Sequence, residues 1–165
     1  MLVGVQIREM QEDDWQTVRD VRLRALREDP EVFGSSLARE EMFAETHWRM
    51  RLRSARTWVS LDAGGTARGL VGMIEEPGSP KSDRHVVQLW VAPEARRHGI
   101  GWSLLDAVRA AALADGAATV SLWVVDGNHA AGDLVVRAGF VRTQERHKLT
   151  RDPTQSEERL VLRLT

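Results

Sequence analysis

A basic turn that contains two glycines is the part of this sequence best suited to binding a charged ligand. It reads Arg96-Arg97-His98-Gly99-Ile100-Gly101 and lies between an apolar segment and a helical pattern. The first N–H groups of a helix have no partner within the helix and lie at the positive end of its dipole. Glycine also lets a backbone approach a ligand closely. The turn therefore indicates a phosphate or pyrophosphate site, or else an ordinary strand-to-helix connection that needs glycine only for its geometry.

The flanking segments predict how this turn is positioned. The apolar segment Val86 to Val91 indicates a buried strand, and Pro93 ends it because proline has no N–H for a strand partner. Regular alternation would place His85, Val87, Leu89 and Val91 on one face of this strand, and Gln88 and Trp90 on the other. After the turn, apolar residues recur at helical spacing: Ile100, Leu104, Leu105, Val108, Ala111 and Ala112.

Known phosphate-binding patterns narrow the choice of ligand. A dinucleotide fingerprint would need glycine at position 104, where the chain has Leu104. The string of a P-loop does not occur in the sequence. The pattern that fits is R-x-x-G-x-G, formed by Arg96, Gly99 and Gly101. An ATP- or NAD-binding domain of another fold therefore stays only as a third alternative.

Composition limits the class of protein. The chain has 165 residues, 42% of them hydrophobic, and a formal net charge of −1. That length suits one domain with a substantial core, and the balanced charge gives no bias towards nucleic acid or an anionic membrane. The absence of cysteine excludes disulfides and a cysteine nucleophile. No stretch predicts a membrane span or a signal peptide, so we expect a cytoplasmic protein.

Periodicity elsewhere predicts one mixed α/β domain over residues 1–165. The expected strands lie at 3–7, 57–61, 68–74, 86–91 and 118–125, and two more begin near 140 and 159; the expected helices lie at 12–28, 38–52, 100–112 and 128–137. The order β-α-α-β-β-β-α-β-α-β-β gives a central mixed sheet of about six or seven strands flanked by about four helices. The two strands of its central β-α-β unit should be parallel.

Two charged groups precede the central module. Arg19, Arg22, Arg24 and Arg27 are expected to form a solvated face of the first helix. The acidic group Glu40, Glu41 and Glu45 is either another exposed face or an attractant for a cationic amine.

A second motif gives the chain a family resemblance. The segment from Asn128 to Phe140 is similar to N-x-x-A-x-x-L-Y-x-x-x-G-F, and Asn128, Ala131, Leu134, Gly139 and Phe140 fit that pattern. Together with R-x-x-G-x-G, it resembles the GNAT superfamily of N-acetyltransferases over nearly the whole chain. The resemblance implies acetyl transfer from acetyl-CoA to a primary amine of a small molecule, peptide or protein, directly within a ternary complex and without a metal.

The resemblance also implies which residues bind the coenzyme. The backbone of Leu89, Trp90 and Val91 would pair with the pantetheine arm like an added strand. The turn that follows would hold the pyrophosphate, and Asn128 would contact the coenzyme arm. The implied coenzyme-binding residues are Leu89, Trp90, Val91, Arg96, Arg97, His98, Gly99, Ile100, Gly101, Trp102, Ser103 and Asn128.

The catalytic groups are less defined by the sequence. The backbone N–H of Val91 is the expected oxyanion donor. The candidate bases that take the proton of the amine are Glu75, Glu76, His85 and, through a bound water, Gln88. The family's usual tyrosine, which often protonates the leaving thiolate, falls at Val135, and the chain has no tyrosine. Ser121 or water is the expected replacement.

The missing tyrosine motivates an alternative function, a GNAT-like domain that binds acyl-CoA as a sensor or interaction module with little catalysis. The expected partners are acetyl-CoA and an amine acceptor, with neither nucleic acid nor membrane, and a second copy of the chain is a further candidate because the family often forms homodimers. Acidic residues favour a cationic amine without naming it. No metal site is expected, because His47, His129 and His147 lack partners at ligand spacing.

Overall fold

Seven strands form one mixed sheet in the computed structural model, which describes residues 4–165. The spatial order is β1-β2-β3-β4-β5-β7-β6. The strands are β1 (Gln6–Glu9), β2 (Arg56–Leu61), β3 (Ala67–Ile74), β4 (Asp83–Val91), β5 (Thr119–Val125), β6 (Val141–Lys148) and β7 (Ser156–Arg163). The helices are α1 (Trp15–Glu28), α2 (Leu37–Glu40), α3 (Glu45–Ser54), α4 (Ile100–Ala114) and α5 (His129–Arg137). Short 3-10 turns are η1 (Glu12–Asp14), η2 (Pro30–Val32) and η3 (Pro93–Ala95).

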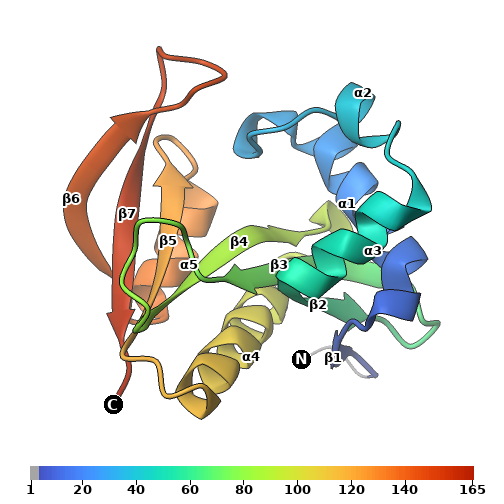
Figure 1. Cartoon of the computed structure of the whole chain (residues 1–165), viewed down its shortest axis with the longest axis horizontal. Helices are drawn as coiled ribbons and strands as arrows, with labels where there is room; N and C mark the ends of the chain where they lie inside the picture. Colours follow the sequence, from blue (N-terminus) through green and yellow to red (C-terminus); the bar gives the residue numbers. More distant parts are fainter. Residues whose placement is uncertain (1–3) are drawn as a thin grey trace.

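Helices cover both faces of the sheet (Figure 1). Helix α4 packs against β2, β3 and β4, while α1 contacts β3 and is itself covered by α3. Apolar side chains such as Leu70, Leu104 and Val108 are fully buried between these layers. The predicted fold class is confirmed, including the parallel pairing of β4 with β5. Of the predicted first strand, Val3 lies outside the described residues.

Strands β4 and β5 separate after a short stretch of pairing. They pair at Asp83, Arg84 and His85 only, although β4 continues to Val91. On its other edge, β4 has one extra residue relative to β3, because Leu70 pairs with Trp90 but Gly72 pairs with Val87. This bulge contains Gln88, whose φ is 49°. The β5-facing edge of β4 beyond His85 is therefore open.

The bulge overturns the expected alternation of side chains along β4. A Cβ at Gly72, which pairs with Val87, would lie 2.8 Å from Val87 Cγ2 and 3.1 Å from Gln88 Nε2, so these two consecutive side chains lie on the face that His85 shares. A regular strand would direct successive side chains to opposite faces. The extra residue rotates the backbone locally, so the prediction that Gln88 lies on the face opposite to His85 was wrong.

The predicted helix at 38–52 was also wrong as a single element. Helix α2 ends at Glu40, and α3 begins at Glu45 after a corner in which Met42 is 80% exposed. The break lets Glu40 meet arginines from both α1 and α3. The expected solvated face of the first helix does not include Arg22, which is only 8% exposed. The expected exposed acidic group does not include Glu40, which is fully buried.

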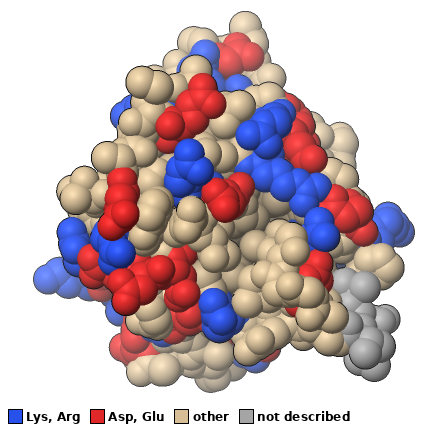
Figure 2. Space-filling model, turned by 90° about the vertical axis from the view of Figure 1, so that its right-hand side faces the viewer, with Lys and Arg blue, Asp and Glu red and all other residues tan. Residues whose placement is uncertain are grey.

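Charges of both signs are interspersed on the outer face around α1 and α3 (Figure 2). Ion pairs account for part of this pattern, among them Arg49 with Asp13 and Arg53 with Glu12. Among residues 4–165, no helix is long and apolar enough to cross a membrane. The same residues contain no group of three or more His, Cys, Asp or Glu side chains that could hold a metal ion.

Candidate active site

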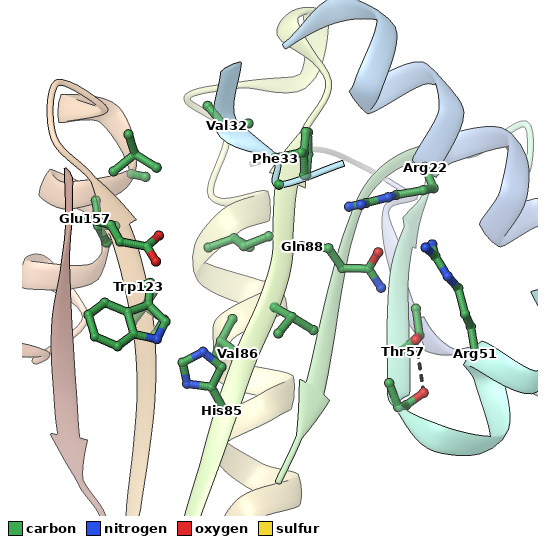
Figure 3. A pocket seen from close by; sticks show the side chains of 18 of the residues that line it. Arg22, Val32, Phe33, Arg51, Thr57, His85, Val86, Gln88, Trp123 and Glu157 are labelled. Carbon is green, nitrogen blue, oxygen red and sulfur yellow. Dashed lines mark hydrogen bonds between the residues drawn. The ribbon is translucent and has the colours of Figure 1, made fainter. Parts of the chain in front are cut away.

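A cavity of about 470 Å³ follows β4 from its split with β5 to the middle of α1 and the C-terminal end of α3 (Figure 3). Its walls come from β4, β5, the start of α5, the loop after η2, and β7. The residues that matter for its chemistry are Arg22, Phe33, Arg51, His85, Gln88, Trp123, Asn128 and Glu157. Cavities of this size accommodate small-molecule ligands. The open edge of β4 and several charged side chains thus share one space.

The turn after β4 offers a row of free backbone donors. Arg97 and Gly99 adopt left-handed conformations, with φ of 65° and 82°. Within residues 4–165, the N–H groups of positions 97 to 102 donate no hydrogen bond, and the first one that does belongs to Ser103, which donates to Gly99 O. Successive free N–H groups at a helix start form a concave anion site. The geometry therefore suits a phosphate group.

The Arg96 side chain anchors this turn. Its Nη2 donates to Asp29 Oδ2 at 2.7 Å, and its Nε donates to Val91 O at 2.8 Å. Trp90 Nε1 donates to the same Asp29 oxygen, and the Trp90 ring is buried outside the cavity lining. The guanidinium of Arg96 therefore positions the turn. The side chains of Arg97, His98, Trp102 and Ser103 are exposed around it.

Gly101 and Asn128 join the turn to helix α5. A Cβ at Gly101 would lie 2.7 Å from Leu134 Cδ2, so glycine permits close packing of the two helices here. Asn128 caps α5, with its Oδ1 accepting from the Ala131 N–H at 3.3 Å. The two sequence motifs therefore meet through the contact between Gly101 and Leu134, and Asn128 lines the cavity while residues 96–103 lie outside its lining.

The N–H of Val91 faces the open edge of β4. The next residue, Ala92, donates its N–H to Arg68 O on the β3 side at 2.7 Å. Successive N–H groups of an extended strand point to opposite edges, so that of Val91 points towards β5. The Val91 carbonyl accepts from Arg96 on the same side. Leu89, two residues earlier, lines the cavity directly.

A buried polar network lies where β4 and β5 part. Ser121 Oγ donates to Asp83 Oδ2 at 2.6 Å and accepts from Arg159 Nη2 at 2.9 Å. Its remaining contact, His85 Nδ1 at 2.8 Å, must therefore be an N–H donor. This leaves His85 Nε2 as the nitrogen that can take up a proton, 3.3 Å from Glu76 Oε2.

Burial sets the protonation of His85. Loss of solvent lowers the pKa of its imidazole, Arg159 lowers it further, and Glu76 and Asp83 oppose the change. The net direction is downward, which favours the neutral ring at pH 7. Since His85 also lines the cavity, it is placed to accept a proton there.

The other residues predicted to act as acid or base are less well placed to exchange a proton with a ligand in the cavity. Glu75 is outside the cavity lining and pairs with Arg84 at 3.2 Å. Burial would raise the pKa of Glu76, but hydrogen bonds from Trp123 and Ser79 and its other partners lower it overall. Ser121 is fully buried outside the cavity lining, and its hydroxyl proton is donated to Asp83. Of the named group, only Gln88 and His85 reach the cavity.

Sequence reasoning missed Glu157 and Trp123. The Glu157 carboxylate points into the gap between β5 and β4 (Figure 3). Burial raises its pKa, with Glu76 adding to the rise and His147 opposing it. In the sequence, Glu157 is one charged residue in a polar loop and carries no motif. Only the pairing of Glu157 with Val125, between β7 and β5, brings it to the site.

The opposite end of the cavity carries two arginines. Arg22 Nε and Nη2 donate to the two oxygens of Glu40 at 3.0 and 2.9 Å, and Arg51 Nη1 donates to Glu40 Oε1 at 3.0 Å. Burial would raise the pKa of Glu40, but the two guanidinium groups outweigh it and lower the pKa to about 2. The predicted acidic attractant is therefore a neutralised carboxylate, and guanidinium groups line the cavity instead.

Comparisons with known proteins give the family and the fold of the chain. A model of the acetyltransferase (GNAT) family matches residues 10–140. An acetyltransferase of the GNAT family from Streptococcus pneumoniae has a TM-score of 0.80 at 15% identity, covering 98% of this chain and 100% of its own. An N-acetyltransferase from Staphylococcus aureus has a TM-score of 0.78 at 16% identity, with coverages of 98% and 99%.

A third solved structure contains a coenzyme. This putative acetyltransferase from Salmonella typhimurium, solved with its cofactor acetyl-CoA, has a TM-score of 0.75 at 16% identity and covers 98% of this chain and 95% of its own. At these identities, the structural likenesses show the fold alone. No curated protein matches the chain significantly.

Proposed function

The chain belongs to the acetyltransferase (GNAT) family, and we propose that it transfers the acetyl group of acetyl-CoA to a primary amine within a ternary complex. In this reaction the amine nitrogen forms a bond to the acyl carbon, the carbon–sulfur bond breaks, and the amine loses a proton while CoA leaves as its thiol. A cytoplasmic location and a homodimer stay predictions from the sequence and the family.

The free donors of the turn after β4 carry this proposal. Six consecutive N–H groups, at positions 97 to 102, have no acceptor within residues 4–165. They match the charge and concave geometry that a pyrophosphate needs. The open edge of β4 adjoins them and suits an extended arm that adds like a strand. Acetyl-CoA supplies both groups together with an activated acetyl thioester.

His85 is the proposed acceptor of the amine proton. A lysine-like amine with a pKa of about 10.4 is mostly protonated at pH 7, so it must lose a proton before attack. His85 Nδ1–H is held by Ser121, and Nε2 is free to take that proton directly or through water. The nearby Glu76 carboxylate would stabilise the resulting imidazolium. The N–H of Val91 is the proposed oxyanion donor.

One observation favours a second candidate, a domain that binds acyl-CoA with little catalysis. Position 135, where the family usually has tyrosine, holds a fully buried valine that has no proton to donate. A thiolate with a pKa of about 8.5 can leave without a dedicated acid, however. Turnover therefore decides between an enzyme and a sensor.

A thermal-shift titration with acetyl-CoA, CoA, ATP and NAD tests coenzyme binding. A ligand at 100 times its Kd stabilises by about 2.7 kcal/mol. Gly99→Glu should abolish the shift by acetyl-CoA, because it places an anion in the turn. Gly65→Glu is the matched control: Gly65 has φ of 83° and an open surround like Gly99, but lies in the β2–β3 hairpin.

Thiol release with an amine panel then tests transfer. Acetyl-CoA binding with turnover supports the enzyme, and binding with no acetylated amine supports the sensor. Stabilisation by ATP or NAD alone would overturn both candidates.

A further inference from the structure

Arg22 is held rigidly at the wall of the cavity. It is only 8% exposed, and its Nε and Nη2 are both engaged by Glu40. Its guanidinium carbon lies 4.6 Å from the centre of the Phe33 ring. Within residues 4–165, its Nη1 donates no hydrogen bond. A fixed guanidinium with an unused donor in a cavity wall is preorganised to receive an oxyanion.

Arg51 approaches the same carboxylate from another helix. Its Nη1 donates to Glu40, while its Nε and Nη2 donate to no residue in the described part of the chain. Its guanidinium carbon lies 5.0 Å and 5.3 Å from the centres of the Trp48 and Phe43 rings. Figure 3 shows Arg51 directed towards the Arg22 side chain, while the Arg22 guanidinium points towards Phe33, with Gln88 beside both. Stacking on aromatic rings limits how far either guanidinium can move.

The two arginines share a single carboxylate. Glu40 stays ionised with its pKa near 2, so one positive charge at this end of the cavity remains unbalanced. The Arg51 side chain is 35% exposed, so water rather than a second carboxylate solvates this charge, and a ligand that displaces the water must replace it as a partner. A ligand anion would supply the missing counterion.

Building on the proposed function, we propose that the acceptor amine is a small molecule that carries a carboxylate, as a free amino acid does, and that Arg22 and Arg51 bind this carboxylate. The carboxylate accepts from the unused guanidinium donors. The amine end extends along the cavity towards Gln88 and His85. A peptide N-terminus has its adjacent carboxyl in an amide bond, so this site would disfavour it.

The carboxylates at the other end of the cavity are consistent with such an acceptor. Glu76 and Asp83 share Arg159, and Glu157 projects into the cavity from β7. An amine approaching His85 therefore enters a region of negative charge. An amino acid has both charges needed to fit the two ends.

Matched pairs of ligands test the carboxylate directly. The nineteen free amino acids with a primary amine are compared with their α-amides, which keep the amine and side chain but lack the negative charge of the α-carboxylate. Binding is measured by thermal shift in the presence of CoA, and transfer is measured by thiol release with acetyl-CoA. At least one free acid should bind and react about 10- to 100-fold better than its amide, because the free energy of a charge-assisted hydrogen bond corresponds to a ratio of this size.

Arg51→Gln should reduce this preference to near unity, mainly by raising KM for the acid, and Arg51→Lys should restore part of it. Arg49→Gln is the matched control, because Arg49 lies on the same helix but pairs with Asp13 and Glu45 at the outer surface. Arg22→Gln is a second test, valid where urea unfolding shows that the variant still folds.

The outcomes separate this inference from the proposed function. Transfer to amines with no preference for acids, or a preference that survives Arg51→Gln, would overturn the inference and leave the acetyltransferase intact. Acid-selective binding without thiol release would support the site and overturn the enzyme. If the protein shows neither acid-selective binding nor acetyl transfer, both the inference and the proposed function are overturned.

Discussion

Two ion networks lie near opposite ends of the cavity, and they are built differently. Near α1 and α3, two arginines converge on Glu40 alone. Near the split of β4 and β5, Arg159 is shared by Glu76 and Asp83, and Ser121 and His85 extend the contacts. The first network has an excess of positive groups and a single anionic centre. The second has an excess of carboxylates and several alternative partners.

This difference indicates which end of the cavity suits the negative group of a ligand and which end suits its positive group. A purely structural ion pair needs one partner for each charge, because unpaired buried charge is costly. Both networks depart from that balance, and they do so with opposite signs near the two ends of the cavity. The imbalance also predicts different sensitivities to mutation, since one network depends on a single residue and the other distributes its contacts.

Glu40→Ala should have the largest effect on stability. It leaves Arg22 buried without a counterion, which costs about 3–5 kcal/mol. Urea unfolding at pH 7 measures this loss. Glu41→Ala, at the exposed neighbouring position, should change stability by less than about 0.5 kcal/mol. A loss below about 1 kcal/mol for Glu40→Ala would mean that the network does not depend on this carboxylate.

His85→Gln should have the largest effect on catalysis at the other end. It should lower kcat about 100-fold, which corresponds to the loss of a general base. The acid limb of the pH–rate profile should disappear, while the thermal shift by acetyl-CoA is retained. His129→Gln replaces an exposed histidine on α5 as a control. An unchanged acid limb would assign the base elsewhere, with Glu157→Gln as the next variant.

Asp83→Asn should cost less stability than Glu40→Ala. Arg159 keeps its bond to Glu76, 2.7 Å from Nη1 to Oε1, so no charge is left alone. Asp83 also accepts from the Thr119 and Ser121 hydroxyls, and the expected loss is about 1.5–3 kcal/mol, the usual worth of a charge-assisted hydrogen bond. The same urea series measures it. A loss equal to that of Glu40→Ala would remove the contrast between a single centre and a distributed network.

The pH dependence of stability should show the smallest effect. The folded-state pKa of His85 is depressed below its ordinary 6.5, so the folded protein binds fewer protons than the unfolded chain as pH falls. Stability is therefore present above pH 6.5 and is lost below it, by up to about 1 kcal/mol per pH unit. His85→Gln should flatten this slope between pH 7 and 5. Because Glu157 titrates in both proteins, the difference between their slopes isolates His85.

Local patterns predicted most of the fold. Helix α4 and the hairpin of β2 and β3 follow from periodicity and turn residues, and these signals depend on neighbours in the chain. The helix predicted at 38–52 is broken by a corner where Glu40 meets arginines of α1 and α3, and these partners carry no signal in the local pattern. The regular alternation of β4 failed because the bulge at Gln88 depends on pairing with β3.

The candidate site also has a part that local sequence predicts and a part that only packing brings together. The coenzyme turn was predicted because its donors are consecutive in the chain, and a helix start exposes them without help from elsewhere. Arg22, Glu157 and Trp123 carry no such signal. They come from α1, β7 and β5, and only packing of those elements around one cavity gives them a shared role.

The sequence by itself determined the family, most of the order of elements and the position of the candidate phosphate turn, because each rests on residues close together in the chain. The tertiary structure alone decided which charged groups are buried, which face the cavity and which remain unbalanced. Burial and charge balance depend on partners that are distant in sequence, such as Arg22 and Glu40, 18 positions apart, and Glu76 and Arg159, 83 positions apart. The proposal about the acceptor therefore rests on how the helices and strands pack around the cavity.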